Sequence, residues 1–463
     1  ETAPLAAHRD LFLDENKQVL PGKSLDGALA AGIPGVPAAL VHLSKNYGQL
    51  PLTTTLAPAI ELAQHGFLLD EHLLKLLRFR QKAIQISPAA ASIFLDYGKV
   101  PGSGTRLVQT DLAHTLSTLA KQGHNGFYKG EIAEKLVASV KHGGGIWSLT
   151  DLARYHVIER KPIAGDYQGA RIISAAPPSS GGLVLMETLN ILNGYALNQL
   201  DRATRKHLIV EAWKRAYRDR AEYMGDPDFV NIPVERLLSQ DYADALNTTI
   251  RNDVALPSQY LAAPQAEIQQ GNNTTHFSVL DKSGNRVAAT LSINYPFGSG
   301  FVAEGTGVLL NDEMDDFVAA PDAPNVYGLI GGSANSIEPG KRMLSSMTPT
   351  FVEAENRVAI LGTPGGSRII TMVCLALLDF INGNDPESWV NLPRFHHQFL
   401  PDQIQYEPGA LSASEIQALH NRGHQLKRLN RRYGNMQAIE WDQSSNTVKA
   451  ASDPRGIGLA VVK

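Results

Sequence analysis

Cysteine is nearly absent from this sequence, because Cys374 is the only one among 463 residues. A single cysteine excludes a disulfide within the chain and any metal cluster held by several thiolates. Cys374 lies inside the apolar run Ile369–Leu378. We therefore expect it to be an inert core residue rather than a catalytic thiol.

Long hydrophobic segments and an excess of one charge are missing as well. The apolar run around Cys374 is interrupted by Asp379, whereas a membrane span needs about 20 apolar residues. We expect a buried helix there and no membrane span. The formal net charge of −4 includes no basic excess, which argues against nucleic acid as a partner. With 43% hydrophobic residues, the composition is typical of a globular protein. A chain of 463 residues is too long for one ordinary core, so we expect two domains or one large layered domain.

The beginning of the chain, "ETAPLAAHRDLFLDENKQ", has neither a basic segment nor an apolar one. No signal peptide is therefore expected within these residues. The missing initiator methionine indicates either processing or a fragment.

Apolar periodicity predicts helices in the first part of the chain. Residues 52–67, 110–128 and 201–227 show apolar side chains at helical spacing and run into glycine. A strand is expected at Arg171–Ser174, before the turn "PPSSGG". Residues 253–271 have weak periodicity and two prolines, so we expect an exposed linker.

Strands are predicted after residue 271. "HFSVLD" and "RVAATLSIN" flank the turn sequence "KSGN", which indicates a β-hairpin. Strand alternation places Ser292 and Asn294 on one face, beside the strand that begins at Thr274 and Thr275. The simpler interpretation is that these polar side chains face water.

The paired threonines raise a chemical possibility. A threonine hydroxyl needs a base to act as a nucleophile, and the α-amine of the same residue has a suitable pKa of roughly 7.7–8.0. An internal threonine gains a free amine only if the chain is cut just before it. The Thr274 hydroxyl could make that cut by attacking the carbonyl of Asn273. The sequence alone does not favour this chemistry over an ordinary strand that begins with two threonines.

Residues 357–381 read as a strand, a glycine loop and a helix. Gly365 and Gly366 precede the helix, where backbone N–H groups are free to bind an anion. A tight turn that merely needs glycine is the alternative. No Walker loop or G-x-S-x-G elbow is present. His396 and His397 are adjacent, so their side chains should diverge, and a shared metal is not expected.

Several motifs in a fixed order carry a resemblance. "PPSSGG", "GDPDF", "TTHFSVLDKSGN", "LNDEMDDF", "KRMLSSMTPT" and "GTPGGSRII" together resemble the γ-glutamyltranspeptidase family over essentially the whole chain. The chain is most similar to bacterial glutathione-cleaving members that carry a lid over the site. Residues 321–332 resemble that lid, and Tyr327 corresponds to its gate.

The resemblance implies an α+β fold, the αββα sandwich of N-terminal-nucleophile hydrolases, in which two antiparallel sheets lie between helical layers. It also implies a precursor that cuts itself. Residues 1–273 would form the large-subunit region, and residues 274–463 the small subunit with a catalytic N-terminal threonine. The two cleavage products would remain together as an intertwined heterodimer.

Catalytic roles follow from the same motifs. The resemblance implies that Thr274 is the nucleophile with its own amine as the base, and that Thr275 provides a supporting hydroxyl. Ser292 would orient the Thr274 amine, at a position that is often threonine in relatives. Gly365 and Gly366 would supply the N–H groups of the oxyanion hole.

Substrate contacts are implied in the same way. Asn294, Glu313 and Asp316 would hold the α-amino end of a γ-glutamyl group, and Ser345 and Ser346 its α-carboxylate. Glutathione or glutamine would be cleaved, and the γ-glutamyl ester would pass to water, an amino acid or a dipeptide. No cofactor or metal is implied. The family suggests a periplasmic or secreted location.

One departure concerns the N-terminus. Family members carry a further stretch before "ETAP", and it ends in an arginine that pairs with the α-carboxylate. Here the sequence begins at Glu1, so we expect an N-terminally truncated chain. Arg342 or Arg368 would be the substitute if this chain binds the carboxylate by itself.

Two alternatives remain at this stage. A glutaryl or cephalosporin acylase of the same superfamily would share the nucleophile but lack the ammonium-binding carboxylates. An unprocessed, inactive homologue would act as a binding protein and stay uncut at 50.1 kDa.

Overall fold

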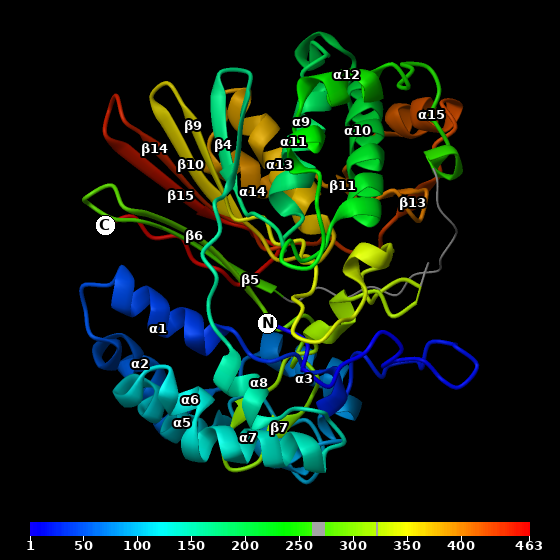
Figure 1. The fold of residues 1–463 in the computed structure, drawn as a ribbon. Coiled ribbons are helices and arrows are strands. Elements are labelled where there is room, and N and C mark those ends of the chain that lie inside the picture. The colour runs from blue at the N-terminus through cyan, green and yellow to red at the C-terminus, as the bar shows by residue number, and fades with distance from the viewer. Residues whose placement is uncertain (262–273, 321–322) are drawn as a thin grey trace. The chain divides into compact units, whose positions relative to one another are not determined.

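The computed structural model describes residues 1–261, 274–320 and 323–463 (Figure 1). The chain forms two compact units, and each takes residues from both sides of residue 273. Unit 1 contains residues 1–159, 293–320 and 336–343, and unit 2 contains residues 160–292, 321–335 and 344–463.

Unit 1 is mainly helical. Its helices are α1 (Val36–Asn46), α2 (Leu52–His65), α3 (Glu71–Ile84), α4 (Pro88–Phe94), α5 (Thr110–Gln122), α6 (Asn125–Tyr128), α7 (Gly130–His142) and α8 (Leu149–Arg154). Short strand pairs join β1 (Phe67–Leu68) to β2 (Arg106–Leu107) and β7 (Val302–Ala303) to β8 (Val308–Leu309). The predicted helix over 52–67 is confirmed, whereas the one over 110–128 breaks at Gly123, whose φ is 59°.

Unit 2 is built on a six-stranded antiparallel sheet with the order β15-β14-β10-β9-β4-β3. Its strands are β3 (Ile163–Tyr167), β4 (Ala170–Ser174), β9 (Thr350–Ala354), β10 (Arg357–Gly362), β14 (Gln437–Asp442) and β15 (Thr447–Ser452). A separate hairpin consists of β5 (Thr274–Leu280) and β6 (Arg286–Ser292). A small sheet contains β11 (Phe395–His396), β12 (Ile404–Tyr406) and β13 (Leu426–Arg428).

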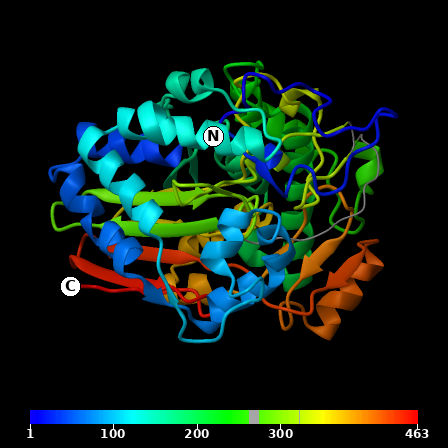
Figure 2. The same cartoon turned by 90° about the horizontal axis from the view of Figure 1, so that it is seen from below.

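The helices of unit 2 cover one face of the large sheet. They are α9 (Gly181–Leu192), α10 (Arg202–Tyr223), α11 (Val234–Leu237), α12 (Gln240–Asn247), α13 (Arg368–Ile381), α14 (Pro386–Asn391) and α15 (Ala413–Asn421). Helices α9 and α13 contact the sheet directly, and the β5–β6 hairpin packs on β10 and β14. Figures 1 and 2 show this hairpin on the face opposite to α9 and α13. Strand β10 is thus covered on both faces, which explains its continuous apolar run Val358–Leu361.

The long apolar run around Cys374 forms α13, as predicted. Cys374 is fully buried, and burial raises the pKa of its thiol to about 12. Among the described residues, no helix is long and apolar enough to cross a bilayer.

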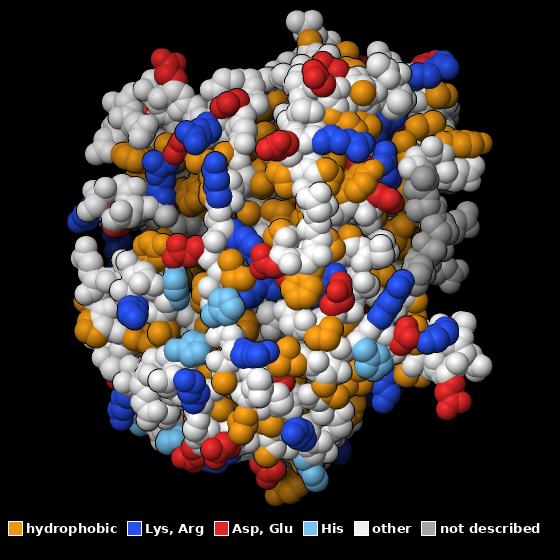
Figure 3. All heavy atoms as spheres, viewed as in Figure 1, with side chains coloured by type: hydrophobic (Ala, Val, Ile, Leu, Met, Phe, Trp, Pro, Cys, Tyr) orange, Lys and Arg blue, Asp and Glu red, His pale blue; other side chains and the backbone are white. Residues whose placement is uncertain are grey.

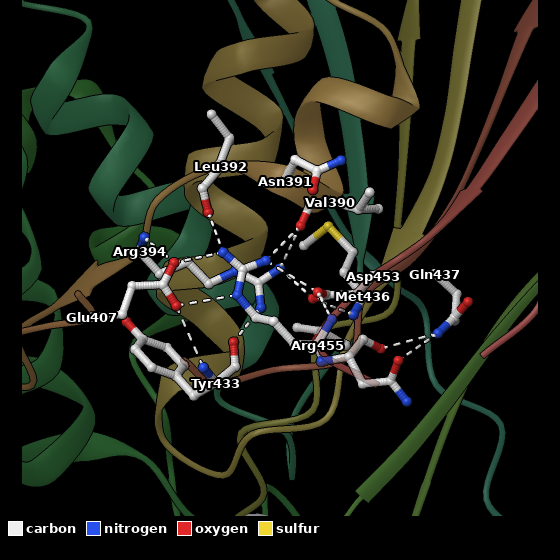
Figure 4. A network of polar contacts seen from close by, with 12 residues as sticks. Val390, Asn391, Leu392, Arg394, Glu407, Tyr433, Met436, Gln437, Asp453 and Arg455 are labelled. Atoms are coloured by element: carbon white, nitrogen blue, oxygen red, sulfur yellow. Dashed lines mark hydrogen bonds and ion pairs between the residues drawn. The ribbon is translucent and has the colours of Figure 1, made fainter. Parts of the chain in front are cut away.

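A buried network of ion pairs ties the end of the chain to the middle of unit 2 (Figure 4). Arg394 pairs with Asp453 at 2.5 Å, and Arg455 pairs with Glu407 at 2.5 Å and with Asp453 at 3.0 Å. Backbone carbonyls of Val390 and Leu392 accept further bonds from the same guanidinium groups. Each buried charge in this network has a partner, and removing one would leave the other uncompensated, so we assign the network to the fold and not to a functional site.

The predicted linker is only partly exposed. Ser258 is fully buried, with its N–H on Asp402 at 2.7 Å and its hydroxyl on the carbonyl of Phe399 at 2.7 Å. Residues 253–257 are more open, and residues 262–271 lie outside the described part. Cationic and anionic side chains are interspersed over the face shown in Figure 3, in agreement with the mixed charge of the sequence.

Candidate active site

The first group of site residues lies at the start of the hairpin. Strand β5 begins at Thr274, which is paired in register with Ser292 at the end of β6. Their hydroxyl oxygens are 3.2 Å apart. Both side chains are half-buried, whereas Thr275 is exposed. Since neighbouring side chains of a strand point to opposite faces, the Thr275 hydroxyl lies on the other side of the strand from Thr274.

A buried histidine supports this hairpin, and its role could not be predicted from the sequence. The two ring nitrogens of His276 form hydrogen bonds with Thr290 at 2.8 Å and Ser278 at 3.1 Å. The ring packs on Gly362 of β10, where a Cβ atom would come within 2.3 Å of it. Burial lowers the pKa of His276 to about 4, so the ring is neutral at physiological pH.

The glycine loop connects β10 to α13. Gly365 has φ of 150° and Gly366 has φ of 57°, and α13 begins at Arg368. The predicted strand, loop and helix are therefore confirmed. The aromatic ring of Tyr327 lies directly on Gly366, because a Cβ atom there would be 2.2 Å from the ring. This contact explains why only glycine fits at residue 366.

The described part of the segment that resembles a lid, residues 323–332, is held against the glycine loop by Gln398. The buried Gln398 amide donates to the carbonyls of Tyr327 at 3.3 Å and Gly328 at 2.9 Å. Its side-chain oxygen accepts from the hydroxyl of Ser367 at 2.7 Å. At the other end of the segment, the N–H of Gly332 donates to the carbonyl of Ala221 at 2.7 Å. Residues 321–322 lie outside the described part.

The serine pair lies beside the "PPSSGG" turn. Ser345 forms an isolated parallel bridge with Ser179, and its N–H donates to the carbonyl of Pro178 at 2.9 Å. Ser346 is buried, and its hydroxyl accepts a hydrogen bond from Arg220 at 3.3 Å. Two motifs about 165 residues apart therefore form one local structure. Nothing in either motif alone indicates this contact.

The two alternative arginines each have a protein partner. Arg368 is buried, bonded to Gln405 at 2.5 Å and placed over the ring of Tyr433. Arg342 belongs to unit 1 and donates to Tyr155 at 3.1 Å.

The acidic group lies in unit 1. Glu313 and Asp316 begin and end a short 3-10 helix, Glu313–Asp316. Glu313 is buried, and its Oε1 has no hydrogen-bond partner among the described residues. Burial, together with the nearby carboxylates of Glu1 and Asp316, holds the pKa of Glu313 well above its usual value. A cation beside this carboxylate would stabilise its charged form, so the group suits an ammonium ligand.

Asn294 needs a correction. Strand β6 ends at Ser292, and Asn294 has φ of 67°, so strand alternation does not extend to it. The expected shared strand face of Ser292 and Asn294 is wrong for this reason. Asn294 is buried, and its side-chain amide donates to the carbonyl of Asp312 at 3.1 Å. The buried Asp312 in turn accepts from the N–H of Tyr295 at 2.9 Å, a contact that was not predicted from the sequence.

One group of potential metal ligands occurs among the described residues. His207, Glu211 and His424 place ligand atoms within 4.8 Å of one another. However, the two imidazoles bond to each other at 2.7 Å, and Glu211 is paired with Lys214 and Arg215. These donors are already used, and two cations stand beside them, so the group fits a buried polar cluster better than a metal site.

His396 and His397 have separate partners, as expected for adjacent side chains. His396 bonds with Thr371 at 2.9 Å and Gln398 at 2.8 Å, whereas His397 lies 3.2 Å from Asp402.

Comparison with known proteins gives a consistent picture. The family described as Gamma-glutamyltranspeptidase matches residues 1–462. A glutathione hydrolase proenzyme of Pseudomonas sp. strain A14 is 44% identical over 431 residues, covering 92% of this chain and 75% of the relative. The glutathione hydrolase proenzyme of Escherichia coli is 40% identical over 462 residues, covering 99% of this chain and 79% of the relative. A crystal structure of cephalosporin acylase from Bacillus halodurans has a TM-score of 0.84 at 27% identity, covering 98% of this chain and 82% of that one.

Proposed function

Because the chain belongs to the γ-glutamyltranspeptidase family, we propose that it is an enzyme that cleaves γ-glutamyl amides such as glutathione through a threonine nucleophile. Thr274 attacks the γ-carbonyl, releases the amine product and holds the γ-glutamyl group as an ester. Water, an amino acid or a dipeptide then takes the group from the enzyme. No cofactor or metal takes part in this scheme.

The observation that carries the proposal is the Thr274–Ser292 pair, with hydroxyl oxygens 3.2 Å apart at the first residue of a strand. Cleavage before Thr274 frees an α-amine, which is a base with a pKa of about 8. The Ser292 hydroxyl lies within hydrogen-bond distance of the Thr274 side chain, and we assign it the role of orienting the Thr274 amine. Thr275 is exposed and faces the other way, so we assign its hydroxyl no direct contact with that of Thr274.

The glycine loop supplies the second requirement, the stabilisation of negative charge on the reacting oxygen. N–H groups of Gly365 and Gly366 precede α13, where the helix dipole favours an anion. One such donor is typically worth about 2.7–4 kcal/mol in the transition state. Tyr327 covers Gly366 and acts as the gate to this loop.

Recognition of the γ-glutamyl group is divided between two sets of residues. The α-ammonium is bound by Asn294, Glu313 and Asp316. Its positive charge would stabilise the charged form of the buried Glu313 carboxyl group, whose pKa is raised by burial. Ser345 and Ser346 bind the α-carboxylate.

The precursor scheme gives two chains, residues 1–273 and 274–463, that form a heterodimer. The name proenzyme of the two relatives supports a processed precursor. A periplasmic or secreted location is part of the proposal and rests on the bacterial relatives alone.

Cephalosporin acylase activity is the second candidate, because one similar structure carries that name. An acylase of this kind takes a side chain without the α-ammonium, and the buried Oε1 of Glu313, which has no hydrogen-bond partner among the described residues, would then stay unmatched. The two activities separate in one assay that compares γ-glutamyl and glutaryl anilides. If the enzyme prefers the glutaryl anilide, the proposed γ-glutamyl activity is wrong and the protein is an acylase.

The central experiment changes the nucleophile. Thr274→Ala should stay uncut and inactive, because it has no hydroxyl for either step, and Thr274→Ser should be cut slowly and keep some turnover. Gel electrophoresis, N-terminal sequencing and γ-glutamyl anilide hydrolysis are the measurements. Ser283→Ala, in the exposed hairpin turn, is the matched loss of a hydroxyl and should behave like the wild type. A Thr274→Ala chain that still splits before residue 274 would assign the cut to another protease.

A further inference from the structure

The "PPSSGG" turn and the end of α10 contain groups to which the proposed function gives no role. The turn is joined to residues 345–347 by several hydrogen bonds. The N–H of Ser180 donates to the carbonyl of Ser345 at 2.8 Å, and the Ser179 hydroxyl donates to the carbonyl of Met347 at 2.6 Å. The turn therefore fixes the backbone of the serine pair.

Arg220, in the last turn of α10, lies behind this contact and is buried, with 4% of its surface exposed. Its Nε donates to the hydroxyl of Ser180 at 2.9 Å, and its Nη2 donates to the hydroxyl of Ser346 at 3.3 Å. A planar guanidinium with several fixed donors can make both bonds at once, which a lysine ammonium at the end of a flexible stem does less well.

These bonds determine which way the hydroxyl hydrogens point. A guanidinium only donates, so Ser180 and Ser346 must each accept from Arg220 with a lone pair. Ser180 then uses its own hydrogen on the carbonyl of Ser345 at 2.7 Å. The hydrogen of Ser346 is left directed away from Arg220. In the part of the chain that the structure describes, it has no protein acceptor.

The hydroxyl group of Ser345 is oriented in a similar way. Its hydroxyl oxygen accepts a hydrogen bond from the N–H of Met347 at 3.0 Å, which leaves its hydrogen to donate elsewhere. Both serines are therefore set as hydrogen-bond donors before any ligand arrives. Among the described residues neither hydroxyl hydrogen has a protein acceptor, and a pair of neighbouring donors of this kind matches a carboxylate.

We propose that Arg220 is a positioning residue for the substrate carboxylate: it holds the Ser346 hydroxyl in the donor orientation directly, and through Ser180 it fixes the backbone of Ser345. The inference rests on the proposed function, because it takes the serine pair as the carboxylate site. It adds a specific consequence, since Arg220 should matter only for substrates that carry the α-carboxylate.

The test compares two anilides that differ in this one group. γ-Glutamyl anilide carries the α-carboxylate, whereas 4-aminobutyryl anilide has the same acyl chain and amine without it. Arg220→Gln should raise the KM for γ-glutamyl anilide about 10–100-fold, the range expected when a hydrogen bond to a charged group is lost, with a smaller change in kcat. With the anilide that lacks the carboxylate, kcat/KM should stay within about twofold of the wild type. Arg220→Lys should fall between the wild type and Arg220→Gln.

Two further variants complete the design. Arg205→Gln removes an arginine of the same helix that donates to the carbonyl of Leu197, so it controls for the loss of a helix arginine. Ser346→Ala, alone and combined with Arg220→Gln, tests whether Arg220 acts through this serine. The double variant should lose little more than Ser346→Ala alone, because coupled residues are not additive. If Arg220→Gln does not accumulate as folded protein, Ser180→Ala takes its place, since it removes the acceptor of Nε.

The outcomes separate the inference from the proposed function. A wild type that hydrolyses neither anilide would overturn the proposed function itself. A wild type active on γ-glutamyl anilide, with an unchanged KM in Arg220→Gln, would overturn only the role of Arg220. Equal losses on both anilides, or additive losses in the double variant, would assign Arg220 to the stability of the fold and not to carboxylate binding.

Discussion

Among single residues, His276 shows how burial couples the hairpin to pH. Its pKa is about 4 because the ring is buried, whereas the imidazole of an unfolded chain has a pKa near 6.5. Between these two pH values the unfolded state binds more protons, so the free energy of unfolding falls as the pH falls through this window. The contribution reaches at most about 3 kcal/mol, since one pKa unit corresponds to about 1.4 kcal/mol.

His276→Gln should therefore make the free energy of unfolding less dependent on pH. Urea unfolding at pH 7 and pH 4, in a Thr274→Ala background that keeps the chain in one piece, measures the change. The histidine form should lose more stability than the glutamine variant between the two pH values, because glutamine does not titrate. His142→Gln controls for the loss of an exposed imidazole. Parallel pH curves with and without His276→Gln would mean that the ring is protonated in the fold as easily as in the unfolded chain.

Strand alternation and the clear turn placed Ser292 beside the strand that begins at Thr274, whereas its link to Thr274 itself was implied by the family resemblance, and the two residues are paired in register. The same logic failed at Asn294, where a positive φ ends the alternation. Arg220 and Gln398 could not be found from the sequence. Their roles arise from contacts with segments far along the chain, and nothing in their own neighbourhood marks them.

At the level of elements, the junction of β10 with α13 depends on glycine for two separate reasons. Gly366 has φ of 57°, and the ring of Tyr327 occupies the place of a Cβ atom. At the other end of α13, Gly383 also has a positive φ, 87°, but no atom lies within 4 Å of its Cβ position. The pair therefore separates backbone strain from crowding.

Gly366→Ala and Gly383→Ala should each lose about 1–2 kcal/mol of stability from the left-handed backbone. Only Gly366→Ala should also displace Tyr327 and shift the loop N–H groups, which lowers kcat about 10²–10³-fold if one oxyanion donor is lost. Thermal unfolding and γ-glutamyl anilide turnover are the two measurements. Similar turnover in both variants would remove the glycine loop and its tyrosine cover from the chemistry.

For the whole molecule, the order of helices and strands along the sequence does not predict which strands share a sheet. Helices first and strands later is a fair description of residues 1–159 against the rest, and the α+β class expected from the family motifs is confirmed by the similar fold of the acylase. However, β3 and β4 belong to the first half of the chain and complete a sheet whose other strands come after residue 349. Pairing between segments so far apart follows from tertiary packing, and local periodicity carries no record of it.

That shared sheet leads to a prediction about the cut protein. Strand β4 lies on the N-terminal side of residue 273 and pairs with β9 on the C-terminal side, with Ile172 opposite Val352, and both side chains are fully buried. Helix α10 also pairs with α15 across the same boundary through Lys206 and Glu415.

Cleavage before Thr274 breaks one peptide bond but none of these contacts. The two chains should therefore elute together in native buffer near 50.1 kDa, like uncut Thr274→Ala, and separate only in denaturant. Size-exclusion chromatography, followed by a denaturing gel of the same fractions, is the measurement. If the shorter chain eluted alone, the β4–β9 pairing would be too weak to hold the cleaved enzyme together, and the heterodimer would need another source of stability.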